Sequence, residues 1–156
     1  MVDKITFPNG DEIIIAGGYS SASDQVYLSI EENIGYEKIL IYLDNEIKFA
    51  NKIEHYIKLE SDYEVVNTIN FTYTENYLTK IEKYNYQNAL TSSISITYTD
   101  SYIEISDDIL LEKIRHNISN SKVIKVIKYN NDINVGEYVD IEYLDNITNV
   151  IDYKGR

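Results

Sequence analysis

The residues that could do chemistry are few and far apart in the sequence. The chain has no cysteine and two histidines, His55 and His116, and a metal site or catalytic base would need both brought together with carboxylates. Pairs of adjacent acids occur at Glu31-Glu32 and Asp107-Asp108. General acid–base catalysis needs carboxylates that face one another across a cleft, which adjacency in sequence does not provide. We therefore expect no catalytic residue, no metal ligand and no cofactor, and predict that the chain is not an enzyme.

Two further stretches have the residue types of ligand-binding loops without their spacing. Asn130–Asn134 (NNDIN) offers oxygen atoms but lacks the alternating acids and the distal glutamate of a calcium loop, so we predict a hairpin turn there. Gly17-Gly18 lacks the further glycines and the Lys-Ser/Thr ending of a phosphate-binding loop. We interpret residues 17–23 as a loop within the domain.

Tyrosine is in clear excess, at 16 of 156 residues. Its large ring suits a pleated sheet, and its hydroxyl group stays satisfied in wet protein contacts. Tyrosines that end apolar strands are expected to pack on the sheet. Those near turns or on the less apolar side are the candidate protein-contact residues: Tyr77, Tyr84, Tyr86 and Tyr102.

The formal charge of −12, from 26 acidic and 14 basic residues, argues against a nucleic-acid partner. Binding a phosphate backbone needs clustered Lys and Arg that release counterions. An acidic surface keeps a protein soluble or complements a basic partner such as a nuclease. Apolar runs are far shorter than the roughly 18 residues that cross a bilayer, so no membrane insertion is expected. No signal peptide is recognisable, which favours the virion or the cytoplasm as location.

The elements that would position these residues repeat along the chain. The stretches Ile69–Tyr84, Ile94–Ser106 and Val139–Tyr153 each begin with apolar residues at every second position and reach a tyrosine. Such alternation predicts antiparallel strands with one apolar face, on which Tyr73, Tyr98 and Tyr143 would pack.

A short polar turn follows each of these tyrosines. Asp and Asn tolerate the left-handed conformation of tight hairpins, so strand pattern and turn chemistry agree. A fainter copy of the repeat covers residues 38–50, and a further turn lies near residue 120. The turn markers are Asn45, Asn76, Ser101, Asn120 and Asn146. Their spacing fits a series of hairpins.

The N-terminus predicts a hairpin over residues 2–16, because the residues PNGD (8–11) separate two apolar runs. The segment 106–121 is ambiguous. Ser106 could cap a helix, with Leu110, Ile114 and Ile118 at spacing four, whereas the alternation of Ile114, His116 and Ile118 favours a strand. The repeat phase favours the strand, and at most one short helix is expected near 107–118.

We thus predict a single all-β domain over residues 1–156, with the N-terminal hairpin at 2–16 and hairpin repeats over about 25–156. The fold is an antiparallel meander of tandem β-hairpins, in a two-layer or partly rolled sheet. Such a meander leaves edge strands and an apolar face, so it must fold over, close on itself or pack against another molecule. A homo-oligomer is one solution.

From about residue 38 to 156 the chain resembles YD-repeat tandem β-hairpin proteins of the bacterial surface and phage structural type. The resemblance rests on the strand ending in tyrosine, the acidic-Asn turn, the segment Leu78-Thr79-Lys80-Ile81 and the closing Tyr153-Lys154-Gly155-Arg156. It implies a scaffold without an active site of its own.

We therefore expect a non-enzymatic structural protein that works through protein–protein contacts, either with itself or with other virion proteins. The placement we favour is an accessory component of a phage virion, such as a tail, baseplate or head-decoration protein. One alternative is an acidic inhibitor or immunity protein that blocks a basic nuclease or nucleic-acid-binding effector. Another is a secreted or surface lipoprotein domain. Acidic residues spread through every turn favour the scaffold, since an inhibitor would concentrate them on one surface.

Overall fold

The computed structural model describes residues 2–20, 25–32, 35–44, 46, 49–144 and 147–154. These residues form strands and turns and no helix, so none of them belongs to a helix that could span a bilayer. The strands are β1 (Val2–Thr6), β2 (Glu12–Ser20), β3 (Gln25–Glu32), β4 (Glu37–Leu43), β5 (Ala50–Leu59), β6 (Asp62–Thr74), β7 (Tyr77–Asn85), β8 (Leu90–Tyr98), β9 (Tyr102–Asp107), β10 (Glu112–Ser119), β11 (Lys122–Asn130), β12 (Ile133–Leu144) and β13 (Ile147–Asp152).

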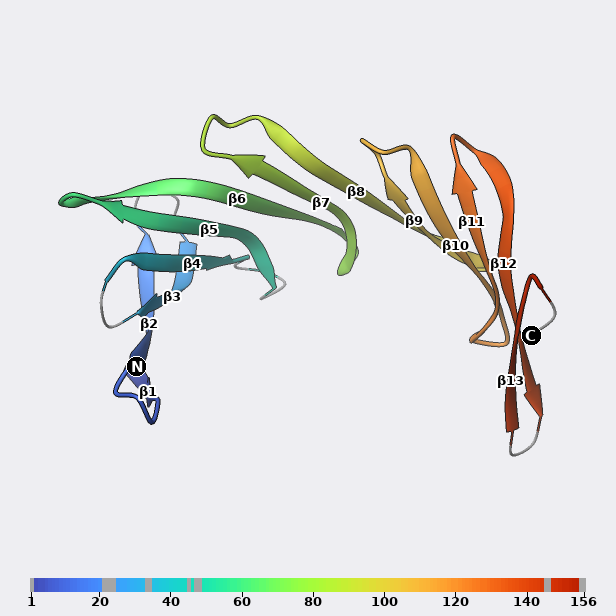
Figure 1. The fold of residues 1–156 in the computed structure, drawn as a ribbon, viewed down its shortest axis with the longest axis horizontal. Helices are drawn as coiled ribbons and strands as arrows, with labels where there is room; N and C mark the ends of the chain where they lie inside the picture. Colours follow the sequence, from blue (N-terminus) through green and yellow to red (C-terminus); the bar gives the residue numbers. More distant parts are fainter. Residues whose placement is uncertain are drawn as a thin grey trace. The chain divides into compact units, whose positions relative to one another are not determined.

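The chain forms two compact units, Met1–Thr91 (unit 1) and Ser92–Arg156 (unit 2). In unit 1, strands β1 to β7 pair in chain order, each antiparallel to the next. In unit 2, β8 to β13 do the same (Figure 1). The predicted all-β meander of tandem hairpins is confirmed, and the sheet is not closed into a barrel. That all 156 residues act as one domain stays a prediction.

Tight turns connect the strands, and their residues supply the backbone conformation that hairpins require. Among the described residues, three two-residue turns have positive φ at both positions: Glu75-Asn76, Asn120-Ser121 and Asn131-Asp132. Positive φ at both central residues defines the type I′ turn, whose twist matches that of the flanking strands. The predicted turns at Asn76, Ser101 and Asn120 and in NNDIN are confirmed. The markers Asn45 and Asn146 lie outside the described residues.

The structure contains the hairpin predicted over residues 2–16, and it pairs Val2 with Ala16. At its turn, the Phe7 amide donates to the Asp11 carbonyl over 2.8 Å, and Gly10 adopts a φ of 91°. That conformation lies in the region that only glycine enters at low cost. The turn predicted at residues 8–11 is therefore the turn that the structure has.

The interpretation of residues 17–23 as a loop was wrong for its first part, because β2 continues to Ser20. Gly17 and Gly18 pair with Leu28 and Tyr27 on β3. A Cβ atom at Gly18 would lie 2.4 Å from the Tyr27 ring, so this glycine makes room for an aromatic ring rather than for a turn. Residues 21–23 lie outside the described part of the chain.

Residues 106–121 form the end of β9, a four-residue turn and β10, so the strand interpretation is confirmed and the helix does not form. The polar residues that suggested a helix start do cap the backbone, but only over a single turn. The Asp107 carboxylate accepts hydrogen bonds from the backbone N–H of Ile109 and of Leu110, at 3.0 and 2.8 Å. It caps a single turn, after which β10 pairs with both β9 and β11.

Neither unit has a conventional hydrophobic core. Within each unit, strands contact only their neighbours in chain order, so no second layer covers the sheet from inside the unit. Among the described apolar side chains only Tyr42 is buried, with 8% of its surface exposed. Figure 1 shows the strand direction turning between β1–β2 and β5–β6 within unit 1, which is the accumulated twist of a rolled, open sheet.

Candidate interaction surfaces

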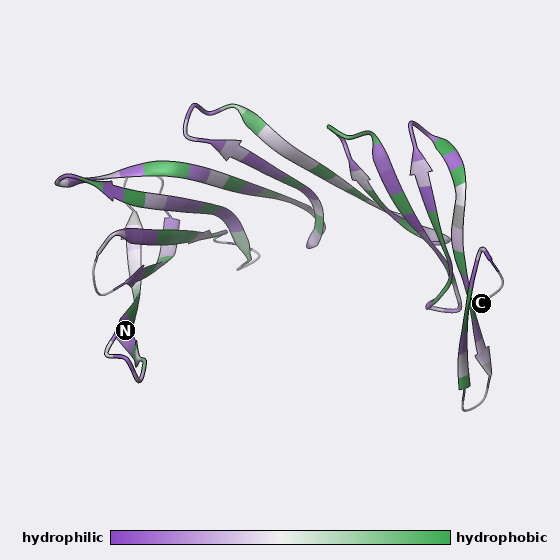
Figure 2. Cartoon of the chain, in the orientation of Figure 1, coloured by the Kyte–Doolittle hydropathy of each residue, from purple (hydrophilic) through white to green (hydrophobic). Residues whose placement is uncertain are grey.

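Each unit presents one apolar and one polar face, because side chains alternate along a strand and directly paired residues share a side. Apolar face 1, in unit 1, comprises Ile5, Ile13, Ile15, Val26, Leu28, Ile30, Ile39, Ile41, Ile53, Ile69, Phe71, Tyr73 and Ile81. Apolar face 2, in unit 2, comprises Ile94, Ile96, Tyr98, Ile103, Ile105, Ile114, Ile118, Val126, Val139, Ile141, Tyr143 and Val150. Both faces include the alternating triplets predicted from sequence. Figure 2 shows the same alternation of hydropathy along the strands of each unit.

The apolar faces are more open to solvent than the polar ones in several strands. On β3, Val26 and Leu28 are exposed, whereas the alternating residues Tyr27 and Ser29 are half-buried. On β10, Ile114 is exposed and its neighbour Arg115 is half-buried. Long polar side chains cover one another on their own face, while nothing within the unit covers the apolar face. On these two strands hydropathy and burial therefore run in opposite directions, which marks an uncovered apolar surface there.

The polar face of unit 1 is organised around one carboxylate, that of Glu54 on β5. Its Oε2 accepts hydrogen bonds from the hydroxyl groups of Tyr56, at 2.6 Å, and of Tyr42 on β4, at 2.8 Å. The ammonium group of Lys52 lies 3.0 Å from Glu54 Oε1 and 4.1 Å from the Tyr42 ring centroid. The cluster ties β4 to β5 through charge-assisted hydrogen bonds and a cation–π contact.

The pKa values in this cluster follow from its contacts. Burial alone would raise the pKa of Glu54, but hydrogen bonds from Tyr56, Tyr42 and Lys52 outweigh it, and the pKa falls below its ordinary 4.5. Burial and the neighbouring Glu54 carboxylate raise the pKa of both tyrosines above 10.0. The cluster thus holds a carboxylate and two neutral phenols, a structural arrangement with no group poised to transfer a proton near neutral pH.

The polar face of unit 2 has a matching cluster around Arg115 on β10. Its guanidinium group donates to Glu104 Oε2 on β9 from Nε at 2.9 Å and from Nη2 at 2.6 Å. The same group lies 4.4 Å from the ring centroid of Tyr102 and 5.2 Å from that of Tyr129. The hydrogen bonds to Glu104 raise the pKa of Arg115. One side chain therefore links β9, β10 and β11.

Sequence reasoning missed both clusters. Their signal is a polar alternation such as Lys52-Glu54-Tyr56, which occurs on many strands. Only the register places Tyr42 beside that strand or Glu104 opposite Arg115.

The acidic pairs singled out in the sequence serve structure. Asp108 Oδ2 accepts hydrogen bonds from the hydroxyl groups of Ser93, at 2.8 Å, and Ser95, at 2.7 Å, while Asp107 caps the β9–β10 turn. Glu31 is paired with Lys38 at 2.6 Å on the polar face, and Glu32 points to the opposite side of the sheet. Neither pair faces a common cleft.

The two histidines lie in different units. His55, on the apolar side of unit 1, has its Nε2 atom 3.3 Å from a carboxylate oxygen of Glu37. His116 lies on β10 opposite Ile103 and Val126, on the apolar side of unit 2. In the described ranges, no group of three or more His, Asp or Glu side chains is placed to hold a metal ion.

Three of the four candidate contact tyrosines, Tyr77, Tyr84 and Tyr86, belong to unit 1, and Tyr102 belongs to unit 2. Tyr77 and Tyr86 are 60% and 71% exposed, at the start of β7 and in the turn after it. Tyr84 is half-buried near the end of β7, on the polar side with Thr68. Tyr102 is half-buried beneath the Arg115 guanidinium. Their role in protein contacts stays a prediction, and the geometry assigns Tyr102 an intramolecular partner.

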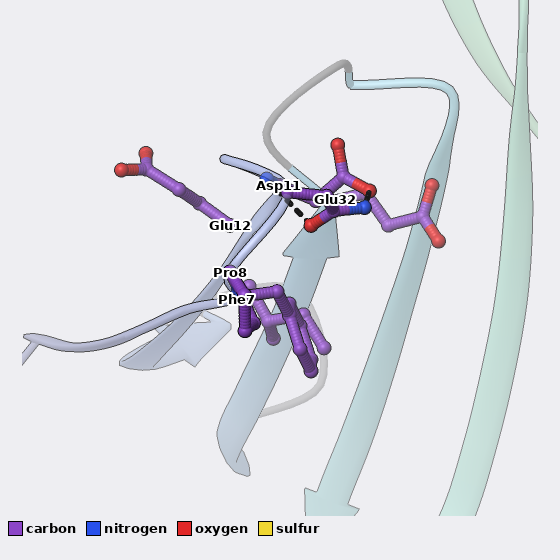
Figure 3. Close-up of a pocket in the computed structure, with 7 residues that line it drawn as sticks. Phe7, Pro8, Asp11, Glu12 and Glu32 are labelled. Atoms are coloured by element: carbon purple, nitrogen blue, oxygen red, sulfur yellow. Dashed lines mark hydrogen bonds between the residues drawn. The ribbon is translucent and has the colours of Figure 1, made fainter.

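A pocket of about 670 Å³ lies at the tip of the first hairpin. Phe7, Pro8 and Ile13 supply its apolar part, and Asp11, Glu12 and Glu32 contribute carboxylates. Figure 3 shows Phe7 and Pro8 side by side, with Glu12 pointing away from them. The pocket has no basic group among its lining residues and no convergent set of donors. Its composition is that of an exposed hairpin tip rather than a catalytic cleft.

Comparison of the chain with protein-family models, with curated proteins and with solved structures found no significant match.

Proposed function

We propose that this chain is a non-enzymatic structural protein whose sheets are completed by contact with other protein surfaces. The observation that carries this proposal is the uncovered apolar face of each unit. Aliphatic side chains on interior strands, such as Ile105 and Ile114, keep 38% and 43% of their surface exposed. Contiguous apolar surface of this kind is typical of protein contact surfaces, which supports the proposal.

The accessible surface supports the same conclusion. The chain exposes 10781 Å², whereas a compact monomer of 18.1 kDa would expose about 8,100 Å² by the usual scaling with mass. Applied to the two units as separate bodies, that scaling yields about 9,700 Å². The chain exceeds that value by about 1,000 Å² over both units together, as expected of single-layer sheets without a covering layer.

The distribution of charge favours a scaffold over an acidic inhibitor. Acids on the polar faces are partnered by basic side chains within the sheet, as Glu54 is by Lys52 and Glu104 by Arg115. An inhibitor that mimics phosphates would present clustered carboxylates to its target. The narrower placement, an accessory protein of a phage virion, rests on the resemblance to YD-repeat hairpin proteins.

Light scattering coupled to size exclusion, together with binding of the dye ANS, tests the proposal. We expect a discrete oligomer or a concentration-dependent series above 18.1 kDa. A monomer that binds ANS strongly would also agree, since its apolar faces would await a different protein. A monomer that does not bind ANS would contradict the proposal, because its apolar surface would already be covered.

A further inference from the structure

The tip of the first hairpin contains the one Asn-Gly pair in the sequence, Asn9-Gly10. Asparagine is chemically labile, because the backbone nitrogen of the next residue can attack its carboxamide carbon and expel ammonia. Glycine in the next position hinders this attack least, since it has no side chain and the greatest conformational freedom. Asn9, Gly10 and Asp11 are all exposed, so water reaches the site.

The backbone of this tip forms a type I turn followed by a glycine bulge. The Gly10 N–H donates to the Phe7 carbonyl oxygen over 2.9 Å, and Gly10 has a φ of 91°. Pro8 occupies the second position of the turn, and Asn9, which does not have a positive φ, occupies the third. In that third position ψ is about 0°, so Cβ of Asn9 is rotated away from the Gly10 nitrogen instead of eclipsing it, as ring closure requires.

The Asn9 carboxamide is held in place by Asp11 (Figure 3). Its Oδ1 accepts a hydrogen bond from the Asp11 backbone N–H at 3.2 Å, and its Nδ2 donates to the Asp11 carboxylate at 2.5 Å. Both ends of the carboxamide are therefore engaged, and the attacking nitrogen is itself a hydrogen-bond donor within the turn. The closed turn thus keeps the two reacting atoms apart, and an open chain would release both.

The hairpin that carries this turn is the least supported part of unit 1. Strand β1 has five residues and, among the described residues, pairs with β2 alone. Its apolar side chains contribute little burial, since Ile5 and Phe7 keep 49% and 44% of their surface exposed. An edge segment with few buried contacts opens locally at a much lower free energy than the whole fold.

We propose that Asn9 is a site of spontaneous deamidation whose rate is set by opening of the first hairpin. The Gly10 nitrogen loses its proton and attacks Cγ of Asn9, so that a new C–N bond forms, the Cγ–Nδ2 bond breaks and ammonia leaves. Water then opens the cyclic imide at either carbonyl and leaves aspartate or isoaspartate. The reaction needs only water, and the inference is independent of the proposed structural function.

The product weakens the turn from which it forms. Either product lacks the Nδ2 donor and sets a second carboxylate against that of Asp11, where the unmodified chain has a hydrogen bond. Isoaspartate also lengthens the backbone within the turn. Because the reaction is irreversible, each modified chain holds β1 on β2 less firmly from then on.

The first test ages the full chain at mildly alkaline pH, in buffer and in urea, and maps its peptides by mass spectrometry. We expect aspartate and isoaspartate to accumulate at Asn9 before any other asparagine, and at least about tenfold faster in urea, where the turn is lost. Asp11→Ala should raise the rate in buffer by at least about threefold, as loss of one hydrogen bond to a charged group allows, and leave the rate in urea unchanged. Asp100→Ala, which removes an exposed carboxylate from a turn of unit 2, should change neither rate.

Three outcomes of this test would overturn the proposal. An Asn9 that stays intact in urea would show that the site is wrongly assigned. Equal rates in buffer and in urea would show that the turn does not control the reaction. Equal rates for Asp11→Ala and Asp100→Ala in buffer would remove Asp11 from the control of the carboxamide.

The second test measures hydrogen exchange of the β1 amides in two variants of residue 9. Asn9→Ser keeps a side-chain oxygen that can accept from the Asp11 N–H but cannot form the cyclic imide, so β1 should stay protected and unmodified after ageing. Asn9→Asp reproduces one product and should speed exchange in β1, with the amides of unit 2 as the internal control. Equal protection of β1 in the two variants would contradict the claim that the reaction weakens the hairpin.

Discussion

At the residue scale, single side chains organise whole sections of sheet. Glu54 binds two phenols and an ammonium group, and Arg115 binds one carboxylate between two aromatic rings. Gly18 acts by the absence of a side chain, because the Tyr27 ring occupies the space above it. Contacts at such positions favour one register of strand pairing over the others that a repetitive sequence would allow.

The Glu54 cluster predicts acid-sensitive stability. Because the pKa of Glu54 is lower in the folded chain than its ordinary 4.5, the unfolded chain binds more protons below that value. This contribution is fully present above 4.5 and is lost as the pH falls through the folded pKa. Thermal melts from neutral pH to about pH 3 should show a shallower acid limb for Glu54→Gln than for wild type. Glu64→Gln, at an exposed position of β6, is the control for loss of one charge and should keep the wild-type slope.

The close approach at Gly18 predicts that two adjacent glycines respond differently to alanine. A methyl group at Gly18 would overlap the Tyr27 ring, which packs at a tilt against the Tyr42 ring with 5.9 Å between centroids. Gly17, by contrast, has no atom within 4 Å of its added Cβ. We expect Gly18→Ala to lower the free energy of unfolding by about 1–3 kcal/mol, the usual cost of overpacking. Gly17→Ala should be neutral or stabilising. Urea denaturation measures the free energy of unfolding of both variants. Equal effects would show that the Tyr27 ring moves aside at little cost.

At the element scale, the hairpin is the repeating unit, and its turns carry the local information. Alternation of polar and apolar residues with Asn or Asp at the turns was enough to predict most strands. Residues 106–121 show the limit, because a helix-capping signal at Asp107 and a strand alternation occupied the same sequence. Pairing with β9 and β11 resolved the conflict, and no local propensity could supply that pairing.

The turn between β10 and β11 predicts a stabilising substitution. Ser121 adopts a φ of 60° after Asn120 at 49°, a conformation that is costly for serine and natural for glycine. Ser121→Gly creates the Asn-Gly pair favoured in type I′ turns and should raise the free energy of unfolding by about 0.5–1 kcal/mol. Ser119→Gly, at the last residue of strand β10, should instead lower the free energy of unfolding. A loss of stability in Ser121→Gly would contradict the assigned turn type.

At the scale of the whole molecule, each unit is an amphipathic sheet whose apolar side lacks a cover within the unit. The usual source of stability, burial of large side chains, is therefore largely unrealised in the isolated chain. The isolated chain is then stabilised by cross-strand hydrogen bonds, ion pairs and tyrosine contacts. Association would supply the missing burial, which links stability to concentration.

This linkage predicts a melting temperature that rises with protein concentration. If folding is completed by association, mass action stabilises the assembled state, and each tenfold increase in concentration should raise the midpoint by a few degrees for a dimer of this size. Differential scanning calorimetry over two decades of concentration measures it. Ile114→Lys, which puts a charge on apolar face 2, should weaken the dependence, and Thr97→Lys, which puts it on the polar face, should retain it. A midpoint independent of concentration in wild type would show that the units are stable alone.

The sequence by itself determined the strands, the turns and the two-faced character of each sheet, because strand periodicity and turn conformation are properties of neighbouring residues. It therefore predicted that Ile94, Ile96 and Tyr98 share a side and that Asn76 and Asn120 mark turns. Only the tertiary structure decided that Tyr42 reaches Glu54, that Gly17 and Gly18 continue a strand, and that Ile105 and Ile114 stay uncovered. These features depend on the register between strands and on contacts that a sheet does or does not make, which are long-range interactions without a local signature.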